Sequence, residues 1–116
     1  MKRDMDLVRC ILVEMEKRPY SLPRTVKLSV EGYSDEEITY HTTLLIEAGF
    51  IAGSALHGKW YPDRLTWMGH EFLDASRDEN RWKKAKKIMM DKAGGVSFEV
   101  VKQLLIQLMK DAVLPS

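Results

Sequence analysis

Apolar residues at helical spacing open the chain and predict a first helix over residues 4–17. Asp4 can cap the N-terminus of this helix, and Pro19 stops it because proline disfavours a helical residue before it. Apolar and polar residues then alternate from Val26 to Val30, which is typical of a short, half-buried strand.

A second helix is predicted from Ser34 to Gly49. Ser34 and Glu37 have the spacing of a capping box, and Gly49 is the expected C-terminal stop. Three acidic residues fill the first turn, where the helix dipole favours negative charge. His41 lies on the flank of the apolar face, so we expect a packing histidine with satisfied hydrogen bonds.

Two strands are predicted over residues 50–56 and 59–65, joined by a turn at His57-Gly58. Three helices follow, over residues 66–78, 79–92 and 97–113; Thr66 and Ser97 are the expected caps of the first and the last, and Gly94-Gly95 separates the last two. The expected fold class is therefore α+β and mostly helical, with a small antiparallel sheet and additional C-terminal helices. We expect one domain, residues 1–116, made of a core (3–78) and a helical extension (79–116).

Part of this core resembles winged-helix regulators. Residues 38–51 are similar to their recognition helix and the start of their wing: His41, an apolar pair, Ala48-Gly49 and two further apolar residues. Leu65-Thr66-Trp-Met-Gly69 resembles the segment that leaves the wing. The resemblance implies a winged-helix-like core over residues 3–78. Those regulators have a short helix before the recognition helix, whereas residues 24–33 here predict a strand and a turn.

A closer resemblance covers nearly the whole chain. It is carried by residues 1–7, 32–34, 40–41, 65–74, 81–82 and 97–100. These residues are similar to an uncharacterised bacterial and prophage family that is known only as a numbered domain of unknown function. The resemblance implies a bacterial or phage setting and no particular chemistry.

Charge is distributed unevenly along the 116 residues, whose formal net charge is only +1. Residues 28–58 contain no lysine or arginine, whereas basic residues outnumber acidic ones over residues 77–92. The overall balance is not that of a generic nucleic-acid binder. No signal peptide or membrane-length apolar run is visible, so we expect a cytoplasmic protein.

Side chains that could carry chemistry are scattered. His41, His57 and His70 fall on different predicted elements, without metal-ligand spacing. The single Cys10 projects from the polar side of its helix and is expected to be an exposed, inert thiol. No phosphate-binding loop or nucleophile motif is present. We therefore expect no catalytic residues, no metal, no cofactor and no enzymatic activity.

Two functions remain open. The first is association with duplex DNA, as a regulator or accessory protein, through the predicted wing and one helix; the candidate contacts are Lys59, Arg64, Lys83, Lys84, Lys86 and Lys87. The exposed side of the predicted recognition helix lacks the arginine, lysine, asparagine and glutamine that usually read bases, so little sequence readout is expected. An ordinary solvated face would also explain the lysines.

The second is a protein-interaction module on a winged-helix scaffold, without DNA binding. Its candidate contacts lie on the second helix: Tyr40, Thr43, Ile46 and Glu47. The helix over residues 97–113 carries an apolar stripe wider than one core face needs, so self-association is a further prediction.

Overall fold

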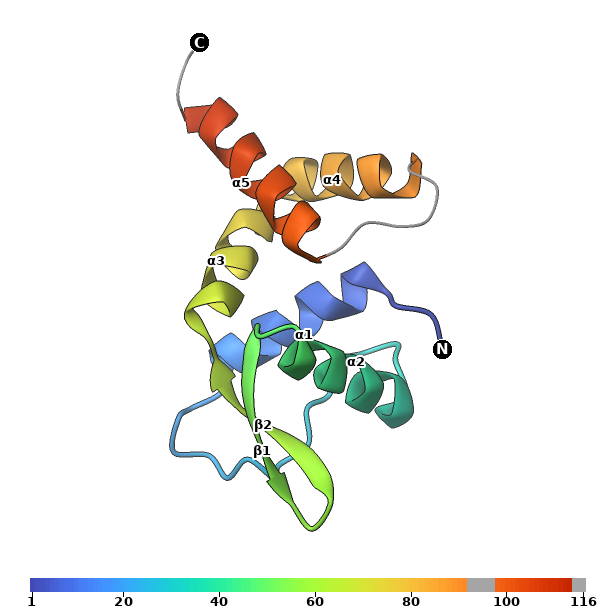
Figure 1. The fold of residues 1–116 in the computed structure, drawn as a ribbon, viewed down its shortest axis with the longest axis vertical. Coiled ribbons are helices and arrows are strands. Elements are labelled where there is room, and N and C mark those ends of the chain that lie inside the picture. The colour runs from blue at the N-terminus through green and yellow to red at the C-terminus, as the bar shows by residue number, and fades with distance from the viewer. Residues whose placement is uncertain (92–97, 114–116) are drawn as a thin grey trace. The chain divides into compact units, whose positions relative to one another are not determined.

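A computed structural model describes residues 1–91 and 98–113, and it confirms the mostly helical α+β fold (Figure 1). The elements are α1 (Met5–Lys17), α2 (Asp35–Glu47), β1 (Ile51–Leu56), β2 (Lys59–Leu65), α3 (Trp67–Ser76), α4 (Glu79–Asp91) and α5 (Phe98–Val113). The chain divides into two compact units, Met1–His70 and Glu71–Ser116, and each is described by itself.

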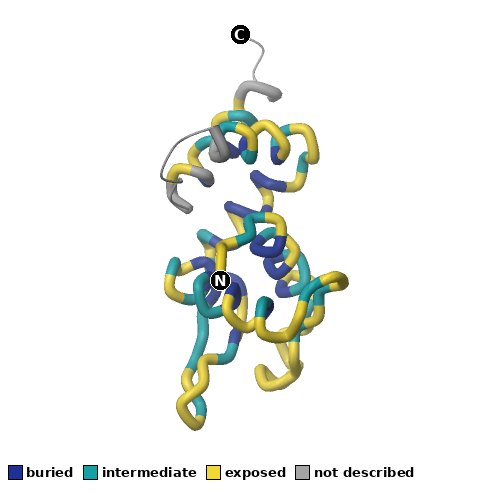
Figure 2. The backbone as a smooth tube through the Cα atoms, turned by 90° about the vertical axis from the view of Figure 1, so that its right-hand side faces the viewer, coloured by how far each residue is buried: buried dark blue, intermediate teal, exposed yellow. Residues whose placement is uncertain are grey.

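The first unit is centred on α1. Asp4 caps this helix as expected, because its carboxylate accepts hydrogen bonds from the backbone N–H groups of Asp6 and Leu7. The apolar stripe of α1 packs against α2 and β2 and is buried at five positions, among the dark blue segments in Figure 2: Leu7, Val8, Ile11, Leu12 and Met15. Burial of each such side chain contributes about 1.5–3 kcal/mol, which makes this stripe the main anchor of the unit.

Helix α2 begins where the capping box predicts. Ser34 Oγ accepts from the Glu37 N–H at 3.1 Å, and Glu37 Oε1 accepts from the Ser34 N–H at 3.0 Å. The helix ends at Glu47, and Gly49 follows with a φ of 83°, which glycine adopts without strain. Its buried side chains are Ile38, His41, Thr42 and Leu45.

The strand predicted over Val26–Val30 is wrong. Residues 18–33, the connector between α1 and α2, run without regular structure through turns closed by hydrogen bonds from Val26 N to Pro23 O (3.1 Å) and from Tyr33 N to Val30 O (3.2 Å). Among the described residues the sheet has only the two hairpin strands, so this segment has no strand to pair with. An alternating apolar and polar pattern does not by itself provide the neighbouring strand that a β-strand must pair with.

The predicted hairpin is confirmed. His57 (φ 51°) and Gly58 (φ 80°) form its turn, both in the left-handed region that two-residue hairpin turns favour. The strands pair antiparallel, with Ala52 opposite Arg64 but Gly53 opposite Pro62. Asp63 is therefore an extra residue, a β-bulge in β2.

Helix α3 begins against the residue that precedes β1. Thr66 caps it: its hydroxyl accepts from the Gly69 N–H at 3.0 Å and donates to the Gly49 carbonyl at 2.6 Å. The Thr66 N–H donates to the Phe50 carbonyl at 3.1 Å. A Cβ on Gly69 would lie 2.1 Å from that same carbonyl oxygen, so only glycine allows this approach.

The second unit is held by aromatic and aliphatic packing. Phe72 of α3 and Trp82 of α4 meet edge to face, with ring centroids 6.2 Å apart. Leu105 of α5 is fully buried, and the nearly buried Lys102 pairs with Glu71 at 3.3 Å. Helix α3 ends at Ser76, two residues before the expected end.

Three predicted features belong to the last two helices and to the segment between them. The expected cap Ser97, the break at Gly94-Gly95 and the last residue of the 79–92 helix lie outside the described residues. Of the apolar stripe of α5, Leu104, Leu108 and Met109 are half-buried. Self-association through residues 97–113 stays a prediction.

Candidate nucleic-acid interface

Helix α4 presents a basic face, which we call the α4 lysine face: Lys83, Lys84 and Lys87. All three side chains are exposed, and within the described part of the chain none of them forms an ion pair. Trp82 and Ala85 are buried on the opposite side, as the helical spacing predicts. The packing of Trp82 therefore fixes which side of α4 faces solvent.

Lys86 departs from the prediction that four lysines project together. Its side chain is half-buried, and its Nζ lies 5.8 Å from the centroid of the Trp82 ring. This is the geometry of a cation–π contact, which is worth about 0.5–1 kcal/mol at a partly exposed site. Lys86 stands on the flank of the helix because Trp82 is one turn before it.

The start of α4 is set by Asp78. Its Oδ1 accepts from the Arg81 N–H at 2.9 Å, which is an N-cap contact. This hydrogen bond, more than the nearby charge of Arg81, lowers the pKa of Asp78. The carboxylate therefore stays ionised at the positive end of the helix dipole.

The hairpin carries the other two predicted cations, and the bulge at Asp63 brings them to one face. Residues opposite each other across an antiparallel pair share a face. Arg64 pairs with Ala52, Tyr61 with Ser54 and Lys59 with Leu56, so these three β2 residues lie on the same side of the hairpin. In a regular strand of the same residues, Arg64 would lie on the side opposite Lys59, because the two are five positions apart. Both cations are exposed.

The side chains predicted for a protein contact are less uniform. Tyr40 is 40% exposed and lies edge-on to His41, and Glu47 is exposed. Thr43 is half-buried and donates to the Thr39 carbonyl. A protein contact through Ile46 requires an exposed side chain, and the structure contradicts this: Ile46 is half-buried, and its Cδ1 lies 2.6 Å from the position of a Cβ built on Gly53. The absent side chain of Gly53 leaves the space that Ile46 fills.

His41 is the satisfied packing histidine that the sequence predicts. Only 1% of it is exposed. Its Nε2 accepts from the backbone N–H of Asp4 at 2.8 Å, and its Nδ1 lies 2.8 Å from the Glu37 carbonyl. Because the carbonyl can only accept, Nδ1 carries the proton. The ring therefore ties the start of α1 to α2.

Tyr33 joins the same cluster, which sequence analysis did not find. Its hydroxyl donates to Asp4 Oδ2 at 3.2 Å. Desolvation, followed by the charge of Asp4 and this hydrogen bond, raises the pKa of Tyr33 to about 12. One carboxylate thus caps α1 and holds the end of the connector.

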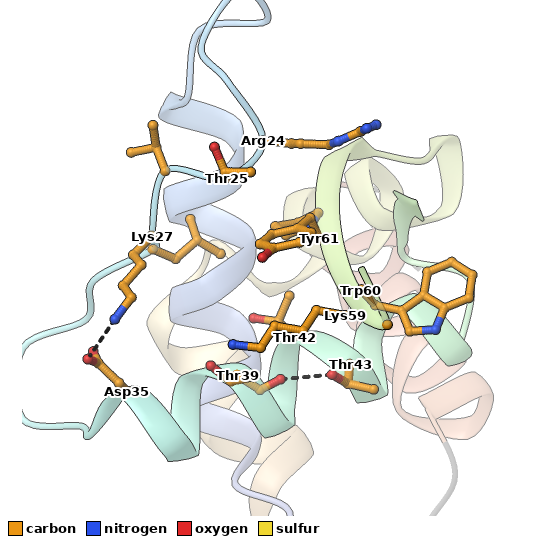
Figure 3. Close-up of a pocket in the computed structure, with 14 residues that line it drawn as sticks. Arg24, Thr25, Lys27, Asp35, Thr39, Thr42, Thr43, Lys59, Trp60 and Tyr61 are labelled. Atoms are coloured by element: carbon orange, nitrogen blue, oxygen red, sulfur yellow. Dashed lines mark hydrogen bonds and ion pairs between the residues drawn. The ribbon is translucent and has the colours of Figure 1, made fainter. Parts of the chain in front are cut away.

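Three distant segments line an open pocket of about 480 Å³ in the first unit, here called the α2–hairpin pocket (Figure 3). Its lining comes from the connector, α2 and the hairpin: Arg24, Thr25, Val26, Lys27, Leu28, Asp35, Thr39, Thr42, Thr43, Gly58, Lys59, Trp60, Tyr61 and Pro62. Of these, only Lys59 and Thr43 were candidate site residues from sequence. No local pattern marks the others, because the connector reaches the hairpin only in the folded chain.

The remaining polar candidates show no shared site. His57 lies in the hairpin turn and His70 is exposed in the first turn of α3. Cys10 is exposed as expected, and desolvation raises the pKa of its thiol. Across residues 1–91 and 98–113, no group of three histidine, cysteine or acidic side chains could hold a metal ion. No helix in these ranges is long and apolar enough to cross a membrane.

A comparison with known protein families shows which family the chain belongs to. The family described as "Hypothetical protein (DUF2513)" matches residues 2–96. The chain belongs to the DUF2513 family. A similar protein, an uncharacterized protein of Haemophilus influenzae, is 33% identical over 108 residues, which is 90% of this chain and 92% of the relative. No solved structure matches the chain.

In this DUF2513 chain, several residues that carry the resemblance are explained by the fold. Ser34 caps α2, His41 fastens α1 to α2, and Thr66 with Gly69 starts α3 against Phe50. These are structural tasks, so the presence of these residues does not point to a reaction centre.

Proposed function

We propose that this chain associates with duplex DNA, with little sequence readout, as a regulator or accessory protein. The observation that carries the proposal is the α4 lysine face, where Lys83, Lys84 and Lys87 are exposed together and, among described residues, have no ion-pair partner. Unpaired cations are the groups that neutralise phosphates and release counterions, which supplies most sequence-independent affinity for DNA.

The hairpin adds support. Lys59 and Arg64 share one of its faces with Tyr61. The order of α2, hairpin and α3 follows that of the recognition helix, wing and next helix in the regulators that the sequence resembles. We infer that the hairpin contacts phosphates beside a groove.

Helix α2 is unsuited to reading bases. Its exposed side offers Glu36, Thr39, Tyr40 and Glu47, and it contains no lysine or arginine. Carboxylates approach the phosphate backbone at an electrostatic cost. The expected DNA affinity is therefore nearly independent of sequence.

A matched pair of variants tests the proposal by fluorescence anisotropy with a labelled random-sequence duplex. The first variant replaces Lys83, Lys84 and Lys87 by glutamine. The control replaces Lys2, Lys17 and Lys110, which are exposed lysines elsewhere, and lowers the net charge equally. At about 0.5–1 kcal/mol per exposed contact, the first variant should lose about 10- to 150-fold in affinity.

The control should lose much less than the α4 variant. Equal losses in both variants would mean that net charge alone drives binding, and the α4 lysine face would not be the interface. No binding by the parent protein at low salt would refute DNA association.

The second candidate is a protein contact through α2, and the exposed edge of Tyr40 beside His41 favours it. Tyr40→Ala and Glu47→Gln would then weaken capture of a host partner and leave the midpoint of thermal unfolding unchanged. Ile46 does not belong in this test, because its truncation would disturb the hairpin packing at Gly53.

A further inference from the structure

The α2–hairpin pocket has the size and composition of a small-molecule site. Its volume of about 480 Å³ falls within the range of roughly 300–1,000 Å³ that is typical of ligand pockets. It lies within the first unit, so its walls come from elements that pack together. Figure 3 shows Tyr61, Thr42, Thr39 and Lys59 gathered around it.

The charges of the lining favour an anion. Three of the lining residues are cations and one is a carboxylate. Arg24 is engaged by Ser54 at 2.6 Å and Asp63 at 3.7 Å, and Lys27 lies 3.5 Å from Asp35. Lys59 is the lining cation that has no ion-pair partner among the described residues. An anionic group would therefore pair with Lys59.

The rest of the lining suits a flat ring with polar edges. The Tyr61 ring forms one wall, and Val26, Leu28 and Pro62 add apolar surface. On α2, the hydroxyls of Thr42 and Thr43 donate to backbone carbonyls, which leaves their oxygens free to accept. Amino groups on a ring edge could donate to these oxygens while the ring stacks on Tyr61.

We propose that the α2–hairpin pocket binds a mononucleotide, with its phosphate at Lys59 and its base against Tyr61. A phosphate monoester carries close to two negative charges at neutral pH, and Lys59 is the lining cation that it would pair with. This site is separate from the α4 lysine face but shares Lys59 with the hairpin surface, so DNA binding through α4 and mononucleotide binding in the pocket are tested by different variants.

The test is calorimetric titration of the whole chain with AMP, GMP, CMP and UMP, and with the matching nucleosides and inorganic phosphate as separate arms. At least one mononucleotide should bind saturably. Its nucleoside and inorganic phosphate should each bind about tenfold more weakly or worse, because each lacks one half of the recognition. Inorganic phosphate that binds as tightly as the mononucleotide would overturn the role of Tyr61, and an equally tight nucleoside would overturn that of Lys59.

Variants decide whether this pocket is the site. Lys59→Gln and Tyr61→Leu should each weaken the mononucleotide about tenfold or more, and Lys59→Arg should retain binding. Lys87→Gln on α4 is the matched control and should bind as the parent does. Thermal unfolding midpoints are compared. Thr43→Val, which removes one of the two hydroxyl acceptors on α2, is a milder variant if Tyr61→Leu unfolds, and it should also weaken the mononucleotide. Absence of saturable binding, or binding that Lys59→Gln leaves unchanged, would overturn the proposal.

Discussion

A single methyl group placed on Gly69 should destabilise the first unit. A Cβ at this position would lie 2.1 Å from the Phe50 carbonyl oxygen and 3.1 Å from its carbon. The carbonyl cannot easily retreat, because it accepts from the Thr66 N–H at 3.1 Å and because the Phe50 N–H is bonded to Leu45 O at 3.0 Å. The first turn of α3 would have to move away from Phe50.

The magnitude follows from opposing contributions. Overpacking against a fixed group costs about 1–3 kcal/mol. Weakening the hydrogen bond from Thr66 to Phe50 adds about 1 kcal/mol, whereas alanine gains about 1 kcal/mol over glycine in a helix. Gly69→Ala should therefore lower the free energy of unfolding by about 1–3 kcal/mol, and the unfolding midpoint by at least about 4 °C.

Urea unfolding followed by circular dichroism measures this difference. His70→Ala is the matched control, since it changes the exposed neighbour in the same turn and should stay within about 0.5 kcal/mol of the parent. Gly53→Ala should fall between them, because its closest clash, at 2.6 Å, is with the flexible end of the Ile46 side chain. A Gly69→Ala protein as stable as the parent would refute the close approach of α3 to Phe50.

Three further predictions concern polar contacts within the two units. His41→Phe keeps a ring but leaves the Asp4 N–H without its acceptor. The free energy of unfolding in urea should therefore fall by about 1–3 kcal/mol. An unchanged value would exclude the link from α1 to α2. Because the pKa of Tyr33 is raised to about 12 from about 10 in the unfolded chain, the folded state holds its proton between these values. The free energy of unfolding should therefore fall as pH rises through this window, and the fall should be smaller in Tyr33→Phe. Urea unfolding at pH 9 and 11 measures it, and an equal loss in both proteins would contradict this assignment. Glu71→Gln removes the charge that faces Lys102 at 3.3 Å. The partly exposed pair should contribute about 1 kcal/mol, measured as a lower thermal midpoint, and a higher midpoint would contradict that contribution.

The features that could be predicted from the sequence are those that residues close together in the chain determine. The capping box of Ser34 and Glu37, the Asp4 cap and the turn at His57-Gly58 are local hydrogen-bonding or backbone preferences, and the structure confirms all three. The burial of His41 could be predicted because helical spacing places it beside an apolar face.

What failed depends on contacts between distant segments. The alternation in Val26–Val30 is real, but no described strand lies beside it. Ile46 is on the polar side of α2 by spacing, yet Gly53 of the hairpin leaves room for it. The pocket could not be predicted because Lys27, Thr39 and Tyr61 meet only after the connector folds over α2 and the hairpin.

The salt dependence of DNA binding tests the central claim most directly. The logarithm of the association constant for a random duplex is measured against the logarithm of salt concentration, for the parent and for the variant with Lys83, Lys84 and Lys87 replaced by glutamine. Each phosphate contact contributes about −0.9 to the slope, so the parent should be steeper than the variant by about 2.7. Equal slopes would show that the α4 lysine face does not contact phosphates and would contradict the account.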